Sequence, residues 1–219
     1  MKAQDALRRA IPLLQEAGIE DGSTVLVGGF GMAGMPVDLT DALIRQGATD
    51  LTVVSNNAGN GDTGLAALLA TGRVRKVVCS FPRQADSWVF DGLYLAGRIE
   101  LEVVPQGNLA ERMRAAGAGI GAFFCPTGVG TPLAEGKETR EIDGRTYLLE
   151  RALHADVALI RAAKGDPFGN LRFYRTSRNF APAMATALAF FPGVDRTIGG
   201  YEGLIQAQAA IADDTVKDA

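Results

Sequence analysis

The sequence is poor in the side chains that metal centres and disulfide scaffolds require. Among 219 residues it has one histidine, His154, and two cysteines, Cys79 and Cys125. The cysteines are far apart and outside any C-x-x-C spacing, so neither a disulfide framework nor a zinc knuckle is indicated. His154 has no second histidine to share a metal, and we expect it to be a turn or helix-end residue. We therefore predict no bound metal and a reducing, cytoplasmic environment.

The chain also lacks a large excess of either charge and any long apolar run. With 22 basic and 25 acidic residues its net charge is −3, which gives no electrostatic reason to expect nucleic acid or a membrane surface as a partner. No apolar run approaches membrane-spanning length. Residues 1–22 have the pattern of an amphipathic helix that carries Asp5 and Glu16 and lacks the apolar core of a secretory signal. We expect a globular protein that acts on small molecules.

Glycine is concentrated where one strand passes into a helix, in the sequence TVLVGGFGMAGMP at 24–36. Four glycines within 28–34 allow sharp turns and a close approach of the backbone to a ligand, because they have no Cβ. The proline that follows suits the first turn of a helix, so we predict that a helix begins at 35–37. The free amides and the positive dipole end of that helix would face a phosphate or a carboxylate.

Three of these glycines also satisfy the dinucleotide fingerprint G-x-G-x-x-G. That fold requires an acidic residue at the end of its second strand, yet the second strand here ends in Ser55, Asn56 and Asn57. No Lys-Ser or Lys-Thr follows the glycines, which excludes a Walker phosphate loop, and no serine lies in a G-x-S-x-G elbow, which disfavours a hydrolase triad. Three interpretations of the loop stay open: a phosphate or thioester ligand, tight helix packing, and a nicotinamide or flavin site.

Apolar runs alternate with helical patterns along most of the chain, which predicts a largely parallel sheet flanked by helices, an α/β fold. The predicted strands are 24–30, 50–57, 74–81, 99–105 and 156–162. The predicted helices are 36–46, 64–70 and 109–116. Loops after the first four strands are polar or glycine-rich, and we expect them to meet at the carboxyl edge of the sheet, where such folds bind ligands. The whole chain, 1–219, is interpreted as one domain.

Other segments have simpler interpretations. Residues 122–150 begin apolar and become charged, which predicts a long hairpin or a mobile flap. Beyond Ala185 only 201–212 has a helix-forming composition. Cys79 and Cys125 lie in apolar settings that raise a thiol pKa and favour inert core roles.

Aromatic, basic and amide side chains supply the remaining candidates. Trp88 is interpreted as a helix residue packed against the sheet. Arg172, Arg175 and Arg178 allow two interpretations of equal weight, a phosphate-facing strip or solvent-exposed positions of an edge strand. Gln106 follows a strand and precedes a helix, and its uncharged N–H donor suits a carbonyl that gains negative charge during acyl transfer. The alternative for Gln106 is a loop-capping amide.

Five segments together resemble the A (α) subunit of class I CoA transferases. They are DGSTVLVGGFGMAGMP, SNNAGNG, VRKVVCSFPRQADSWVFD, VVPQGNLAERMRAAGAGIGAFFCPTGVGT and EGKETREIDGRTYLLE. The resemblance covers Asp21 to Ala185 in order and spacing, and it leaves residues 186–219 as a divergent C-terminal segment. It implies the α/β fold shared by CoA transferases and sugar-phosphate isomerases.

The resemblance implies CoA transfer from succinyl-CoA to a 3-oxo acid, with 3-oxoadipate from aromatic compound degradation as the expected acceptor. Acetoacetate and short-chain fatty acids are alternative acceptors. The family's route passes through a γ-glutamyl thioester, whose glutamate belongs to the B (β) subunit within a Ser-Glu-Asn-Gly motif that this chain lacks. We therefore expect the CoA transferase B subunit as a partner in a hetero-oligomer, an acyl-CoA thioester as substrate and no permanently bound cofactor. Alternatives from other classes are a nucleotide-dependent oxidoreductase and a non-catalytic ligand-binding module.

The resemblance also implies roles for individual residues. Gln106 would donate a hydrogen bond near the reacting carbonyl, and Asn56 and Asn57 would line the acyl pocket. Arg83 is hypothesised to hold the distal carboxylate of 3-oxoadipate bidentately, with an ordinary surface arginine as the alternative. The loop that would border CoA comprises Gly28, Gly29, Phe30, Gly31, Met32, Ala33 and Gly34.

Overall fold

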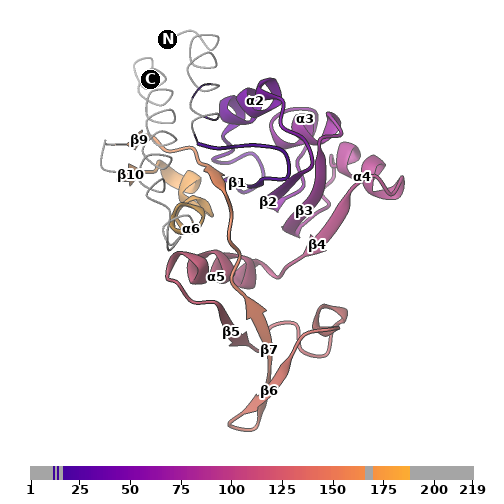
Figure 1. Ribbon diagram of the computed structural model, residues 1–219, viewed down its shortest axis with the longest axis vertical. Helices are drawn as coiled ribbons and strands as arrows, with labels where there is room; N and C mark the ends of the chain where they lie inside the picture. The colour runs from indigo at the N-terminus through magenta and orange to yellow at the C-terminus, as the bar shows by residue number, and fades with distance from the viewer. Residues whose placement is uncertain (1–11, 13, 15–16, 166–169, 188–219) are drawn as a thin grey trace.

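A five-stranded parallel sheet forms the centre of the chain (Figure 1). The structure is a computed structural model that describes residues 12, 14, 17–165 and 170–187. The strand order is β4-β3-β2-β1-β8, and every neighbouring pair is parallel. The strands are β1 Thr24–Val27, β2 Leu51–Asn57, β3 Val74–Phe81, β4 Glu100–Val103 and β8 Val157–Leu159. The predicted α/β fold is confirmed, and each of these strands lies within its predicted range.

Both faces of this sheet are covered by helices, because successive strand residues point to opposite faces. Val25 and Val27 pack into a core with one group of helices, whereas Leu26 packs into a second core on the other face. The first group is α2 Val37–Gln46, α3 Leu65–Ala70 and α4 Trp88–Leu95, and the second group is α5 Gln106–Gly117 and α6 Ala181–Thr186. Strands buried on both faces read as continuous apolar runs, as their sequences do.

The helix predictions are right in type and less accurate in extent. The helices α2 and α3 match their predicted ranges closely, whereas α5 begins earlier than predicted, at Gln106. The expectation that Trp88 packs against the sheet is wrong, because its side chain is 58% exposed. The residue that α4 buries is Phe90, which stacks on Tyr94 with ring centroids 5.6 Å apart. Because α4 is apolar on nearly every side, periodicity does not identify its inner face.

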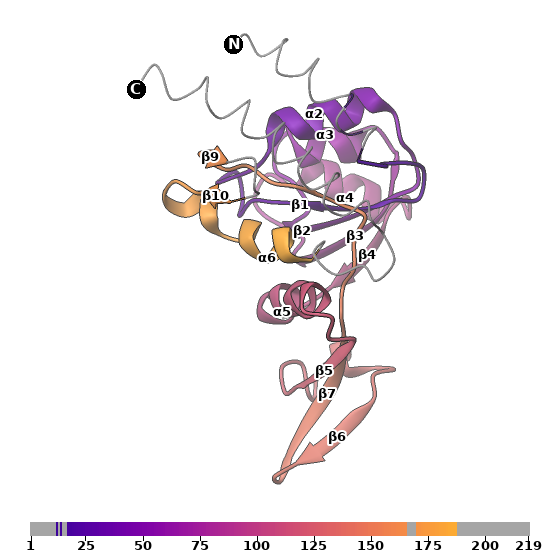
Figure 2. The ribbon, with the colours of Figure 1, turned by 60° about the vertical axis from the view of Figure 1, so that its left-hand side comes forward.

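A second, antiparallel sheet extends away from the central one (Figure 2). Its strands are β5 Ala122–Cys125, β6 Thr139–Ile142 and β7 Arg145–Arg151, in the order β5-β7-β6. The short 3-10 turn η1, Pro132–Ala134, lies between β5 and β6. We call residues 122–151 the arm. The predicted hairpin is present as β6 and β7, and β5 adds a third strand to it.

The segment after β8 returns to the central sheet. It contains the two-stranded ladder of β9 Lys164–Gly165 and β10 Leu171–Arg172, the 3-10 turn η2 Arg175–Arg178, and α6. The predicted helices at 1–22 and 201–212 lie largely or wholly outside the described residues. None of the described helices has the length and apolarity needed to cross a membrane.

Candidate functional site

The glycine-rich loop follows β1 at the carboxyl edge of the central sheet. Gly29, Gly31 and Gly34 have φ angles of +123°, +57° and +75°, in the region that side chains with a Cβ rarely adopt. A Cβ on Gly29 would also lie 3.2 Å from Cα of Met35, which begins the approach to α2. The glycines are therefore required by the tight path of the chain. This requirement holds whether or not a ligand binds there.

The tip of this loop is a closed turn with apolar side chains outside. The amide of Phe30 donates to the Ala33 carbonyl at 3.0 Å, and the amide of Ala33 donates back at 3.1 Å. Phe30 and Met32 are each 49% exposed. The loop therefore presents two large apolar groups at the carboxyl edge, a feature that its glycine pattern did not predict.

The helix that follows the loop begins at Val37, within the predicted range, after Pro36. Its first turn contains Asp38, whose carboxylate opposes the positive potential of the helix N-terminus. The anion-binding argument from the sequence is therefore weaker at α2 than the glycine pattern alone suggests.

A polar cluster joins three chain segments at the same edge. Asn56, at the end of β2, donates through Nδ2 to Ser80 Oγ at 2.9 Å and approaches Gln106 Oε1 at 3.4 Å. Ser80, at the end of β3, donates from Oγ to the Asn56 carbonyl at 3.1 Å. Two of the predicted site residues, Asn56 and Gln106, are thus brought together. Ser80 was not predicted, and its place beside Asn56 follows from the β2–β3 register.

Gln106 lies at a favourable point for stabilising negative charge. It is the first residue of α5, it is exposed, and the first turn of that helix contains no acidic residue. Because Oε1 faces Asn56, the Nε2 donor is the free end of the amide, and no hydrogen bond uses it within the described residues. A helix N-terminus adds positive potential at the same place. Sequence reasoning missed this contribution because it placed the helix start at 109.

Asn57 has an unpaired donor in a buried position. Its Oδ1 accepts from the Gly59 amide at 2.8 Å, whereas its Nδ2 has no partner although the residue is 1% exposed. Ser55 Oγ, also on β2, is buried without a partner. Unpaired buried polar atoms are uncommon and require an explanation. Both belong to the end of β2, next to the cluster of Asn56 and Gln106.

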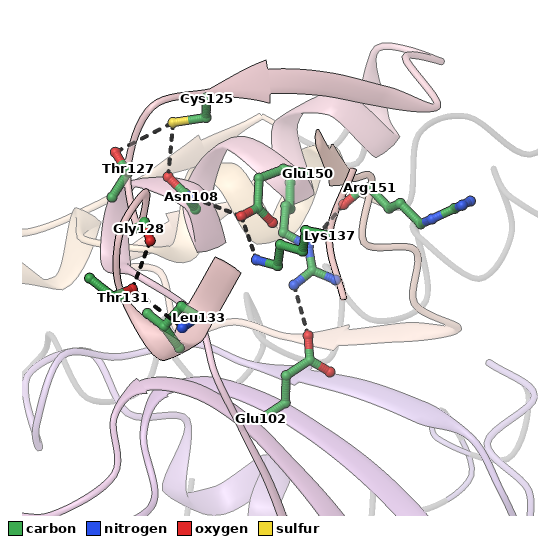
Figure 3. Close-up of polar contacts among 11 residues, drawn as sticks. Glu102, Asn108, Cys125, Thr127, Gly128, Thr131, Leu133, Lys137, Glu150 and Arg151 are labelled. Atoms are coloured by element: carbon green, nitrogen blue, oxygen red, sulfur yellow. Dashed lines mark hydrogen bonds and ion pairs between the residues drawn. The ribbon is translucent and has the colours of Figure 1, made fainter. Parts of the chain in front are cut away.

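A buried ion pair fastens the arm to the first turn of α5 (Figure 3). Glu150 on β7 is 2% exposed, and its Oε1 accepts from Lys137 Nζ at 2.6 Å and from Asn108 Nδ2 at 3.0 Å. Cys125 Sγ donates to the Oδ1 of Asn108 at 3.2 Å. Asn108 follows Gln106 closely in the same helix. The base of the arm therefore restrains the helix end that carries Gln106.

Another ion-pair network joins α5 to the central sheet. Arg112 Nη1 lies 2.9 Å from one oxygen of Glu102, and Lys76 Nζ lies 2.5 Å from the other. Arg112 also donates from Nε to the Arg151 carbonyl at 2.8 Å. Burial alone would raise the pKa of Glu102, but hydrogen bonds and charges from Arg112 and Lys76 outweigh it, so the pKa is lowered. Glu102 thus serves as a structural anion between β3, β4 and α5.

The predicted carboxylate clamp, Arg83, is engaged within the chain. Its Nε lies 3.0 Å from one oxygen of Asp91, and its Nη2 donates to the other at 3.1 Å. The Arg83 side chain is 74% exposed. A ligand carboxylate would therefore compete with Asp91, a neighbour that the sequence did not indicate.

Two of the remaining candidates lie away from the cluster of Asn56, Ser80 and Gln106. Cys79 is fully buried on β3, and burial raises its pKa to about 12, in accord with an inert role. His154 is exposed between β7 and β8. The apolar setting expected for Cys125 is wrong, because its thiol is partly exposed and meets Asn108 and Thr127. The described residues contain no group of three or more metal-ligating side chains.

Comparison with known proteins gives consistent results along most of the chain. A family model described as Coenzyme A transferase matches residues 15–211. The chain is 72% identical over 170 residues to the A subunit of 3-oxoadipate CoA-transferase from Pseudomonas putida, covering 78% of this chain and 74% of the relative. It is 62% identical over 169 residues to the protein of the same name from Acinetobacter baylyi, covering 77% and 74%.

A solved structure with the same fold is the acyl-CoA transferase of E. coli O157:H7 in a thioester complex with CoA. The TM-score is 0.68 at 25% sequence identity. The match covers 81% of this chain but only 40% of that chain, so more than half of that enzyme has no counterpart here.

Proposed function

The chain belongs to the coenzyme A transferase family, and from this membership we propose that it is the A subunit of an enzyme that moves CoA from succinyl-CoA to 3-oxoadipate. The names and high identities of the two bacterial relatives support this substrate pair. The enzyme would act in the cytoplasm during degradation of aromatic compounds. The acyl-CoA thioester is a substrate in this proposal, and no resident cofactor is needed.

The observation that carries the proposal is the cluster of Asn56, Ser80 and Gln106 at the carboxyl edge. It presents an amide N–H donor and a helix N-terminus to solvent, and it contains no nucleophile. Within the described residues no glutamate forms a hydrogen bond to any of the three. The site would therefore be completed by the glutamate of the B subunit.

The chemistry would proceed by two acyl transfers. The partner's carboxylate attacks the carbonyl of succinyl-CoA, which expels the CoA thiolate and leaves a mixed anhydride; the thiolate then attacks the glutamyl carbonyl of that anhydride, which gives a γ-glutamyl thioester and releases succinate. The carboxylate of the 3-oxo acid then repeats these steps in reverse to leave as its CoA thioester. Each tetrahedral intermediate bears an oxyanion, and Gln106 Nε2 would donate to it.

The role of Gln106 is testable by separating its two amide ends. Replacing it with alanine removes the donor, and loss of one such donor typically lowers kcat about 100- to 1000-fold. Gln106→Glu keeps an oxygen toward Asn56 but places an acceptor where the donor was. Both variants should therefore lose kcat. If Gln106→Glu retains wild-type kcat, the residue only supports Asn56 and the proposed role is wrong.

Arg83 is proposed to select the acceptor by exchanging Asp91 for the distal carboxylate of 3-oxoadipate. Acetoacetate has no such group, so Arg83→Ala should lower kcat/KM for 3-oxoadipate about 10-fold or more and leave acetoacetate unaffected. Asp91→Asn provides a matched control, because it removes the competitor and leaves the arginine. An equal loss for both acids in Arg83→Ala would contradict selection by this residue.

The proposed function as a whole is tested with the purified chain and the B subunit of a 3-oxoadipate CoA-transferase. The chain alone should show no CoA transfer from succinyl-CoA, and mixing the two should restore it. The kcat/KM for 3-oxoadipate should exceed that for acetoacetate. A preference for acetoacetate would assign the chain to the alternative acceptor. Activity of the isolated chain would contradict the proposal.

A further inference from the structure

Positive charge is concentrated in the segment that follows β8. Between 157 and 187 the sequence has five basic residues and one acidic residue, although the chain as a whole has a net charge of −3. The basic residues are Arg161, Lys164, Arg172, Arg175 and Arg178. All five are exposed. This part of the surface therefore differs in sign from the protein as a whole.

Three of these cations have no carboxylate to balance them. Within the residues that the structure describes, no ion pair involves Arg172, Arg175 or Arg178. Elsewhere, surface arginines are paired with carboxylates, as Arg75 is with Asp50 and Glu100. We call Arg172, Arg175 and Arg178 together the arginine strip.

The segment that bears the strip packs directly on the glycine-rich loop. Asn179 Nδ2 donates to the Ala33 carbonyl at 2.9 Å. A Cβ on Gly34 would lie 3.0 Å from Cα of Ser177, so glycine is needed there for the two segments to approach. The strip thus stands beside the end of β1, on the same edge as the cluster of Asn56, Ser80 and Gln106.

Two local features are costly unless an anion is present. Arg172 lies directly opposite Lys164 in the β9–β10 ladder, and like charges at opposite positions destabilise a strand pair. Arg175 adopts a φ of +50°, which is uncommon for a residue with a Cβ and is found disproportionately at functional sites. Ser177 fixes that turn by hydrogen bonds to both the amide and the carbonyl of Tyr174. The strain is thus held in place by the fold.

An exposed aromatic ring adjoins the strip. Tyr174 is 63% exposed, and the guanidinium of Arg175 lies 4.9 Å from the centre of its ring. Planar bases stack on such rings, and arginine guanidinium groups bind phosphates in a fork geometry. The combination suits a ligand that carries a purine and several phosphates together.

We propose that the arginine strip binds the diphosphate and 3′-phosphate of the CoA thioester, with Tyr174 against its adenine. This inference rests on the proposed function and adds to it a binding site for the nucleotide end of the substrate. The strip lies at β1, and Gln106 follows β4 in the order β4-β3-β2-β1. Three strand spacings of about 4.8 Å separate them by about 14 Å, a gap that the extended pantetheine arm of CoA would bridge.

The test compares substrates that differ only at the nucleotide end. In the complex with the B subunit, Arg172→Gln, Arg175→Gln and Arg178→Gln are assayed with succinyl-CoA, succinyl-dephospho-CoA and succinyl-pantetheine. Loss of a charge-assisted contact should raise KM for succinyl-CoA about 10-fold or more in at least one variant. The KM for succinyl-pantetheine, which has no phosphates, should not change. Dephospho-CoA shows which arginine meets the 3′-phosphate.

Arg98→Gln is the matched control, since Arg98 is exposed and precedes β4 at the opposite edge of the sheet. It makes the same change in charge and should leave every KM unaltered. An unchanged KM for succinyl-CoA in all three strip variants would overturn the inference. So would an equal rise for succinyl-CoA and succinyl-pantetheine, which indicates a structural role. Failure of the wild-type complex to transfer CoA would instead overturn the proposed function.

Discussion

The central sheet and the arm are stabilised in different ways. The strands of the sheet lie between two helical layers, and residues such as Val53 and Leu26 are fully buried. Within the arm, 122–151, only Leu148 and Glu150 are buried, and every residue of β6 is exposed. The sheet is therefore held by apolar burial on both faces, whereas the arm depends on its ladder and on a single buried ion pair.

This difference separates two functions of the scaffold. Rigid strands fix Asn56 and Ser80 at the carboxyl edge, because their backbones belong to the buried ladder. Gln106 depends on both regions, since it begins α5 and the next turn of that helix is fastened to the arm through Asn108. A change in the arm should therefore reach Gln106 without unfolding the sheet.

The largest effect is expected from a cavity in the sheet. Leu26→Ala, at a fully buried position of β1, should reduce the free energy of unfolding by about 2–5 kcal/mol. Ile142→Ala in the arm, where the side chain is 39% exposed, should change it by less than about 0.5 kcal/mol. Urea unfolding of both variants measures the contrast. Similar losses in the two would show that the arm and the sheet contribute alike.

A smaller and local effect is expected from the buried ion pair. Glu150→Ala leaves Asn108 and Lys137 without their acceptor, at a cost of about 1–3 kcal/mol. Amide exchange at Leu148 and Leu149 should accelerate, while exchange at Val53 should not. Glu150→Gln keeps an acceptor oxygen and should have a milder effect. Equal acceleration in the sheet and the arm would show that they open as one unit.

The two cysteines provide a probe of each region. Burial raises the pKa of the Cys79 thiol to about 12, so this cysteine should remain unmodified by a thiol reagent in the native protein. Cys125, which is partly exposed in the arm, should react first. Mass spectrometry of partially labelled protein identifies the modified residue. Labelling of Cys79 at the same rate would contradict the rigid burial of β3.

The smallest effect is a pH dependence at the junction of α5 with the sheet. Because the pKa of Glu102 is lowered in the folded state, its stabilising contribution is complete above the ordinary value of 4.5 and is lost as pH falls below it. The wild-type Tm should therefore fall more steeply between pH 5 and pH 3 than that of Glu102→Gln. Parallel curves would show that Arg112 and Lys76 do not stabilise the carboxylate.

Sequence patterns predicted the central sheet better than the arm or the site. Buried parallel strands produce apolar runs such as VRKVVCSF, which marks β3 from end to end. Long-range neighbours leave no such local signal. The pairing of Arg83 with Asp91, the ion pair of Glu150 with Lys137 and the approach of Ser177 to Gly34 all depend on how separate elements pack.

The candidate site illustrates the same limit. The types of Asn56 and Gln106 and their positions after strands indicated a polar edge, but only the strand order places them beside each other. The start of α5 was displaced because the sequence PQGN contains a glycine and an asparagine, which are weak helix formers. Tertiary contacts of Asn108 with Glu150 compensate for that weakness.

The central claim is that this chain supplies the charge-stabilising half of a site whose nucleophile belongs to another chain. The most direct test incubates the complex of the chain and its B subunit with succinyl-CoA, reduces the thioester with borohydride and maps the modified glutamate by peptide mass spectrometry. The account predicts that the modification lies on the partner chain. A modified glutamate within residues 1–219 of this chain would contradict it.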